Sequence, residues 1–195
     1  MSKIEVNQID TISGSSTLLV GPSAATKLTF SSTLTVDFNV NSPGVTLGAD
    51  MKNTPSFFAS LSSDQTISDN SLTLGAFATE VYDSGDYDNS ATNYKFTPSI
   101  AGKYFFYGRA WITIPSGTDA RMVIYKNGSA AYYSSNVTGG ARDLTVVMAH
   151  TAIANGSTDY FQCYLYQNSG NGTDTFEFLA DGGKTCWGAY RIIGA

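Results

Sequence analysis

The chain has 195 residues, of which 42% are hydrophobic, so it can bury a core and is not wholly disordered. Only 14% are charged, against about 25% in an average soluble protein, and this scarcity of long charged side chains excludes a helical bundle. The net charge of −5, with scattered Lys and Arg, argues against a nucleic-acid partner, and no apolar run approaches the ~20 residues of a membrane span.

Residues 1–53 differ from the rest of the chain. They contain no Tyr or Trp, and their aromatic residues are Phe30 and Phe38. Segment 28–40 alternates apolar and polar residues like a strand, and 18–20 and 45–47 are shorter strand candidates. Because so few apolar residues cannot build a core alone, we interpret residues 1–53 as a β-rich stem and attachment arm. The alternative is a flexible leader.

Residues 54–195 are rich in aromatic side chains and regular in pattern. Apolar alternation recurs in segments 57–61, 72–74, 102–112, 120–125, 144–149, 160–166 and 185–193. Asn127-Gly128, Asn155-Gly156 and Asn171-Gly172 are turn signals between them, because Asn and Gly tolerate the positive φ of a type I′ turn. The pattern predicts an all-β antiparallel sandwich or jelly roll.

Several motifs between residues 55 and 195 resemble the pattern of the C1q/tumour-necrosis-factor (TNF) family. They are Asp86-Tyr87-Asp88, the segments 94–98 and 101–107, Lys126-Asn127-Gly128, Tyr160-Phe161 and the closing Trp187-Gly188-Ala189-Tyr190. The resemblance implies a C1q/TNF-like jelly-roll sandwich of about ten strands that assembles as a homotrimer. An upstream collagen Gly-x-y repeat, present in the animal proteins, is missing. We expect these aromatic residues to fill the core or the trimer interface: Tyr104, Phe106, Trp111, Tyr164, Trp187 and Tyr190.

Residues 3–18 resemble the leader of virion appendage proteins from marine bacteriophages, especially those infecting cyanobacteria. The resemblance implies attachment to other virion proteins through this arm, with Ile4, Val6, Ile9 and Ile12 as the attachment residues. The first ten residues also lack the apolar stretch of a secretory signal. A virion protein assembled in the host cytoplasm and exposed on the particle exterior after lysis needs no such signal.

Catalytic groups are scarce. The one histidine, His150, ends an apolar strand segment, and no Gly-x-Ser-x-Gly motif is present, so we expect no enzyme and assign no catalytic residue. Cys163 and Cys186 lie in strand-like segments, and we interpret them as two buried free thiols rather than a disulfide.

An acidic segment is the candidate metal site. Asp83, Asp86 and Asp88 could bind Ca²⁺, because hard cations prefer several oxygen ligands on a flexible loop. The alternative is an ordinary turn, since Asp, Ser, Gly and Asn all favour turns. We expect no other cofactor.

Candidate binding loops combine Tyr, Asn, Ser and Gly, the composition of adaptable binding surfaces. Their residues are Tyr132, Tyr133, Asn136, Tyr166, Asn168 and Asn171. The alternative is that the tyrosines serve the core or the trimer axis.

Together these features predict a non-enzymatic phage structural protein. We expect a trimeric tail fibre or adhesin whose head, residues 54–195, contacts a glycan or protein of the host surface. A capsid head fibre or decoration protein is an alternative, and a free carbohydrate-binding lectin is another.

Overall fold

The computed structural model describes residues 52–114, 119–134, 137–138, 142–170, 172 and 175–193. The chain divides into two units, Met1–Val45 and Thr46–Ala195, and every described residue belongs to the second. The strands predicted at 18–20, 28–40 and 45–47, and the attachment residues Ile4, Val6, Ile9 and Ile12, therefore lie outside the described residues. The boundary after residue 53 stays a prediction.

The described residues form two antiparallel β-sheets, as predicted, with one short 3-10 turn, η2 (Asp181–Gly183). The first sheet has the strand order β2 (Gln65–Ser68), β13 (Thr175–Phe178), β7 (Ala101–Ile114), β14 (Cys186–Arg191), β1 (Ser56–Ser60) and β4 (Thr79–Asp83), and β11 (Arg142–Asn155) also pairs with β7. The second has the order β10 (Val137–Thr138), β8 (Asp119–Lys126), β12 (Phe161–Asn168), β6 (Lys95–Phe96) and β5 (Tyr87–Asp88), while β3 (Ser71–Leu74) pairs with β12 and β9 (Ser129–Tyr133) with β8.

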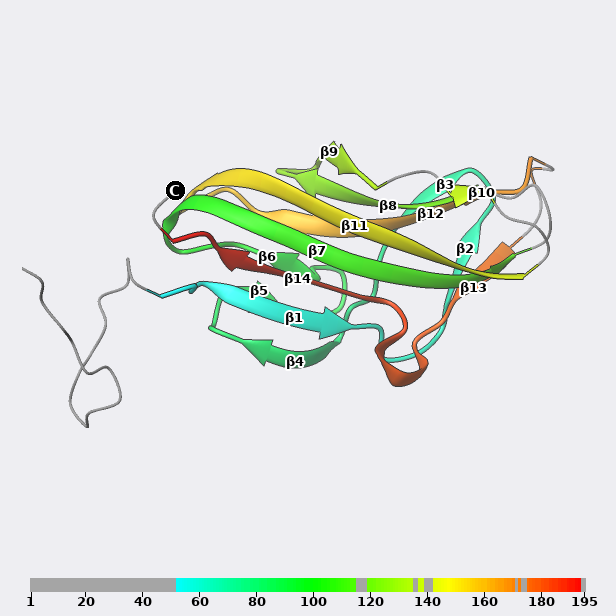
Figure 1. The fold of residues 1–195 in the computed structure, drawn as a ribbon, viewed down its shortest axis with the longest axis horizontal. Coiled ribbons are helices and arrows are strands. Elements are labelled where there is room, and N and C mark those ends of the chain that lie inside the picture. The colour runs from blue at the N-terminus through cyan, green and yellow to red at the C-terminus, as the bar shows by residue number, and fades with distance from the viewer. Residues whose placement is uncertain are drawn as a thin grey trace, which may run out of the picture. The chain divides into compact units, whose positions relative to one another are not determined.

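Strands β7 and β11 form the longest ladder and run side by side in Figure 1. Their register is continuous from Ala101 opposite Asn155 to Ile114 opposite Arg142. Along β7 the even-numbered side chains from Tyr104 to Ile112 are buried, whereas the odd-numbered ones face outward. This period of two is the alternation that the sequence predicts for segment 102–112.

The core between the sheets is aromatic. The Trp187 ring on β14 lies 4.8 Å from the Phe57 ring on β1, and the Phe106 ring on β7 lies 4.6 Å from the Phe161 ring on β12. The second contact joins the two sheets. Burying a side chain of this size stabilises a fold by roughly 1.5–3 kcal/mol, so these rings hold the sandwich together.

The structure divides the predicted strands more finely than expected. It has fourteen strand segments among the described residues rather than about ten, because turns isolate the two-residue strands β5, β6 and β10. The predicted turn between β8 and β9 is confirmed, since Asn127 has φ 52° and Gly128 has φ 79°.

Cys163 and Cys186 are both buried and free, in agreement with the sequence interpretation. Among the residues described, no helix has the length and apolar character to span a membrane.

Candidate functional surfaces

The outer face of the first sheet carries five aromatic side chains in adjacent positions. Directly paired residues of antiparallel strands point to the same face, and Phe58 is paired with both Gly188 and Tyr82, Gly188 with Tyr107, and Phe105 with Tyr190. We call this set the aromatic strip: Phe58 (β1), Tyr82 (β4), Phe105 and Tyr107 (β7) and Tyr190 (β14).

The rings of the aromatic strip contact one another across the strands. The Phe58 ring is stacked 5.9 Å from that of Tyr107 and 6.2 Å from that of Tyr82, and Phe105 lies 6.3 Å from Tyr107. The hydroxyls of Tyr82 and Tyr107 share a hydrogen bond of 3.0 Å. Burial, and secondly this bond, raises the pKa of Tyr107, so this phenol keeps its proton at neutral pH.

Gly188 allows the strip to lie flat on the sheet. A Cβ at this position would come within 2.6 Å of the Phe57 carbonyl oxygen and 2.9 Å of the Tyr107 hydroxyl. The Tyr107 ring therefore crosses β14 where that strand has no side chain, which brings it to Phe58 on the far side.

The surface next to the strip is apolar as well. A shallow pocket of about 430 Å³ is lined by Phe58 and Tyr107 of the strip and by Val147 and Ala149 of β11, among others. Val147 is 64% exposed, and Tyr82 is 45% exposed. Exposed apolar side chains gathered in this way make this surface a candidate interaction site.

The outer face of the second sheet has a different composition. Arg121 is paired with Tyr166, and Val123 is paired with both Tyr164 and Tyr133, so these side chains face the same way. We call the following residues the tyrosine–arginine face: Arg121 and Tyr125 (β8), Tyr133 (β9), and Tyr164 and Tyr166 (β12).

A guanidinium lies close to two phenol rings on this face. The Cζ atom of Arg121 is 4.1 Å from the centre of the Tyr166 ring and 5.8 Å from that of Tyr133. The rings of Tyr125 and Tyr164 are stacked at 3.9 Å. Burial, and secondly the neighbouring Tyr125, raises the pKa of Tyr164.

The aromatic residues predicted for the core or the trimer interface divide among three places. Tyr104, Phe106 and Trp187 are fully buried in the core. Trp111 and Tyr190 lie on the outer face of the first sheet, whereas Tyr164 lies on the outer face of the second. The sequence interpretation did not name Phe58, Tyr82, Phe105 or Tyr107 as site residues. The one available signal was the period-two alternation of β7, which places its odd-numbered residues, Phe105 and Tyr107 among them, on the outer face.

The predicted loop residues lie on strands where the structure describes them. Tyr132 and Tyr133 belong to β9, and Tyr166 and Asn168 to β12. Tyr132 packs against the core and lies 4.2 Å from the His150 ring. Tyr166 is only 7% exposed and donates a hydrogen bond to Asn70 Oδ1, and Asn168 accepts one from the Gly170 amide. Asn136 and Asn171 lie outside the described residues.

The three aspartates proposed as calcium ligands each bind the local backbone or side chains. Asp83 Oδ1 accepts hydrogen bonds from the amides of Asp86 and Tyr87, and Asp86 Oδ2 accepts two from Ser99. Asp88 accepts hydrogen bonds from Ser90 and Asn93, and those from Ser90 lower its pKa the most. In the described part of the chain, no group of three or more His, Cys, Asp or Glu side chains could hold a metal ion. These contacts favour the turn interpretation, and calcium binding stays a prediction.

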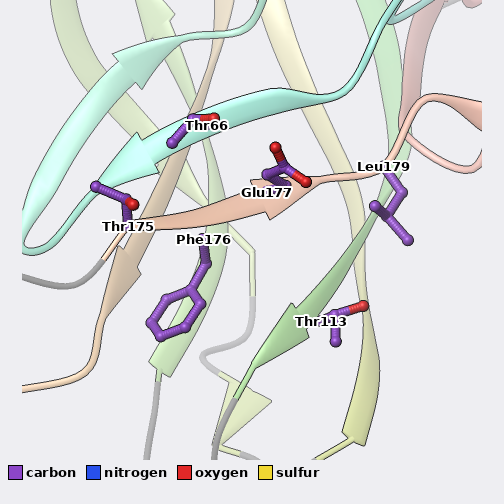
Figure 2. Close-up of a pocket in the computed structure, with 6 residues that line it drawn as sticks. All are labelled: Thr66, Thr113, Thr175, Phe176, Glu177 and Leu179. Carbon is purple, nitrogen blue, oxygen red and sulfur yellow. The ribbon is translucent and has the colours of Figure 1, made fainter.

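A separate pocket of about 340 Å³ lies where β2, β13 and β7 meet. Figure 2 shows Thr66 on β2, Thr175 and Glu177 on β13, and Thr113 on β7, with the Phe176 ring on the other side of β13 from Glu177. The pocket is open, and its described lining offers threonine hydroxyls and one carboxylate, that of Glu177.

His150 and Cys163 are held in structural positions. His150 Nδ1 accepts a hydrogen bond of 2.9 Å from the Thr151 amide, and the ring packs on Tyr132. Burial strongly raises the pKa of the Cys163 thiol, which suppresses the nucleophilic thiolate form.

Neither a protein-family model nor a curated protein matches this sequence. The fold is similar to the solved structure of Eiger, a TNF from S. frugiperda, with a TM-score of 0.50 and 10% identity over 72% of this chain and 92% of that chain. Murine APRIL at pH 5.0 gives a TM-score of 0.53 with 10% identity, covering 70% of this chain and 98% of that chain. The globular domain of zebrafish complement 1qA protein, at 13% identity over 71% and 97% of the two chains, has a TM-score of 0.49.

At these identities the likeness defines the fold alone. The described residues form an all-β jelly roll like those of Eiger TNF and APRIL, so the jelly-roll fold that the resemblance of residues 55–195 implied is confirmed.

Proposed function

We propose that this protein is a non-enzymatic structural protein of a bacteriophage virion. Three copies associate through the aromatic strip, residues 1–53 attach the trimer to other virion proteins, and the jelly-roll head contacts the host surface as a tail fibre or adhesin. The protein is assembled in the host cytoplasm and exposed on the particle exterior.

The aromatic strip is the observation that carries this proposal. Its stacked rings, together with exposed Val147 on β11, form an apolar face that gains free energy when another surface covers it. A second copy of this chain is a suitable cover, because aromatic side chains are enriched at the buried centres of protein interfaces. Closed rotational symmetry covers this face on every copy, whereas an open chain leaves it uncovered at one end, and the number three follows the resemblance to the C1q/TNF family.

The virion assignment rests on the resemblance of residues 3–18 to phage appendage leaders. A trimer suits adhesion because it presents every weak contact of the head three times, and linked sites gain avidity without new contacts. Nothing in this role needs a catalytic group, and the environments of His150 and Cys163 fit a structural role.

Light scattering coupled to size-exclusion chromatography of the full chain tests the assembly. We expect the mass of three chains at micromolar concentration. A stable monomer would contradict the proposal.

Mass spectrometry and electron microscopy of purified particles test the location. We expect the protein in intact particles, with density attached to the tail. Density at capsid lattice points would contradict the tail assignment, and absence from particles would contradict the virion role.

A further inference from the structure

Arg121 has an unusual set of contacts on the second sheet. Its guanidinium lies against Tyr166 and faces Tyr133, yet among the described residues it forms no ion pair and no hydrogen bond. Its Nε atom is buried without a hydrogen-bond partner. Cation–π contact of this kind uses the face of a ring and leaves the N–H donors of the guanidinium without a hydrogen-bond acceptor.

Unpaired N–H donors on a permanently charged group suit one class of ligand best. A guanidinium presents a planar fork of donors that matches the two oxygens of a carboxylate, and such charge-assisted pairs are about twice as strong as neutral hydrogen bonds. No ion pair among the described residues includes Arg121.

The surroundings of Arg121 suit a sugar ring. Tyr133 is 52% exposed, and the stacked pair Tyr125 and Tyr164 lies farther along the same face. A phenol ring offers an apolar face with a partial negative charge, on which the C–H bonds of a pyranose can lie, and a hydroxyl that can bond to the sugar.

We propose that the tyrosine–arginine face binds a carboxylate-bearing sugar of an acidic polysaccharide, with Arg121 pairing with the carboxylate and Tyr133 supporting the sugar ring. This inference rests on the proposed contact with the host surface and specifies its ligand as a polyuronate-type glycan. The aromatic strip is on the other sheet, so assembly and glycan binding use separate surfaces.

Calorimetric titration of the full chain with oligogalacturonate tests the inference, with neutral dextran oligomers and dextran sulfate in parallel. We expect oligogalacturonate to bind and neutral dextran not to bind. Arg121→Gln should weaken binding at least tenfold, and Arg121→Lys by about tenfold, because lysine keeps the charge and loses the fork. Tyr133→Ala should weaken binding about tenfold, whereas Tyr133→Phe should retain most of it.

Lys52→Gln is the matched control, since it removes one positive charge from an exposed position outside the strands and should leave binding within twofold. Unaltered thermal unfolding of each variant confirms that it is folded. Equal binding of oligogalacturonate to wild type and to folded Arg121→Gln would overturn the inference, as would equal binding of neutral dextran, preference for dextran sulfate, or no binding of oligogalacturonate. None of these results bears on the trimer or on the particle location, which light scattering and the analysis of purified particles test separately.

Discussion

The outer faces of the two sheets both carry aromatic side chains from neighbouring strands, but only the second set includes a charged residue, Arg121. On the first sheet the rings of the aromatic strip contact one another through stacking and a hydroxyl–hydroxyl bond, and the strip itself contains no acidic or basic residue. On the second sheet the guanidinium of Arg121 lies close to Tyr166 and Tyr133, and no ion pair among the described residues includes it. An aromatic surface whose polar groups already bond to one another can be covered by a copy of the same chain. A surface that contains a cation without an ion pair suits a ligand that supplies the opposite charge.

The largest expected effect comes from the core that supports both faces. Phe106→Ala removes the ring that joins the sheets and should lower the free energy of unfolding by about 3–5 kcal/mol. Urea denaturation of the full chain measures this change. Val81→Ala, at an exposed position outside the aromatic strip, is the control and should change stability by about 0.5 kcal/mol or less. A small effect of Phe106→Ala would show that the two faces do not depend on one shared core.

The next effect separates the two faces. Phe58→Asp places a charge in the centre of the aromatic strip and should weaken trimer formation about 100-fold, since an unpaired carboxylate would be buried at the interface. Tyr133→Asp is the matched change on the second sheet and should leave the trimer intact. Light scattering over a concentration series distinguishes the outcomes. Dissociation by Tyr133→Asp alone would exchange the roles of the two faces.

A single hydroxyl gives a smaller effect. Tyr107→Phe removes the bond to Tyr82 and should destabilise the protein by about 1 kcal/mol while keeping the stacked ring. Chemical denaturation measures it, with Tyr125→Phe as the corresponding change on the second sheet. An equal loss in both variants would mean that the Tyr82–Tyr107 bond contributes nothing specific.

Tyrosine ionisation has the smallest effect near neutral pH. Burial raises the pKa of Tyr104 from 10.0 to about 12 and also raises that of Tyr107. The unfolded chain therefore loses these protons first, so their contribution to stability is present below pH 10 and declines as the pH rises toward 12. Unfolding midpoints measured between pH 8 and 11.5 should fall above pH 10, and Tyr104→Phe should reduce that fall. A stability independent of pH in this range would contradict the burial of these phenols.

Much of the fold could be predicted because its signals are local. The period-two alternation of residues 102–112 appears as β7, and Asn127-Gly128 forms the expected turn. The candidate surfaces depend instead on register between distant segments. Phe58 meets Tyr107 only because both strands pair with β14 around Gly188, and no pattern near either residue specifies that pairing.

Local composition is a weaker guide to sites, because composition does not show which groups a side chain will contact. Asp83, Asp86 and Asp88 are close in sequence, but their oxygens accept hydrogen bonds from nearby residues. Arg121 gave no sequence signal, since it is one of a few scattered basic residues. Its position opposite Tyr166, 45 residues later in the chain, makes it distinctive.

The β7–β11 ladder also has a mechanical consequence. Its fourteen paired positions on each strand span about 45 Å, at 3.3–3.4 Å per residue. A tensile force that pulls the two strands apart along their length loads these backbone bonds in shear, so that they share the load instead of opening one after another. Pulling along these two strands should therefore meet more resistance than peeling them apart from one end.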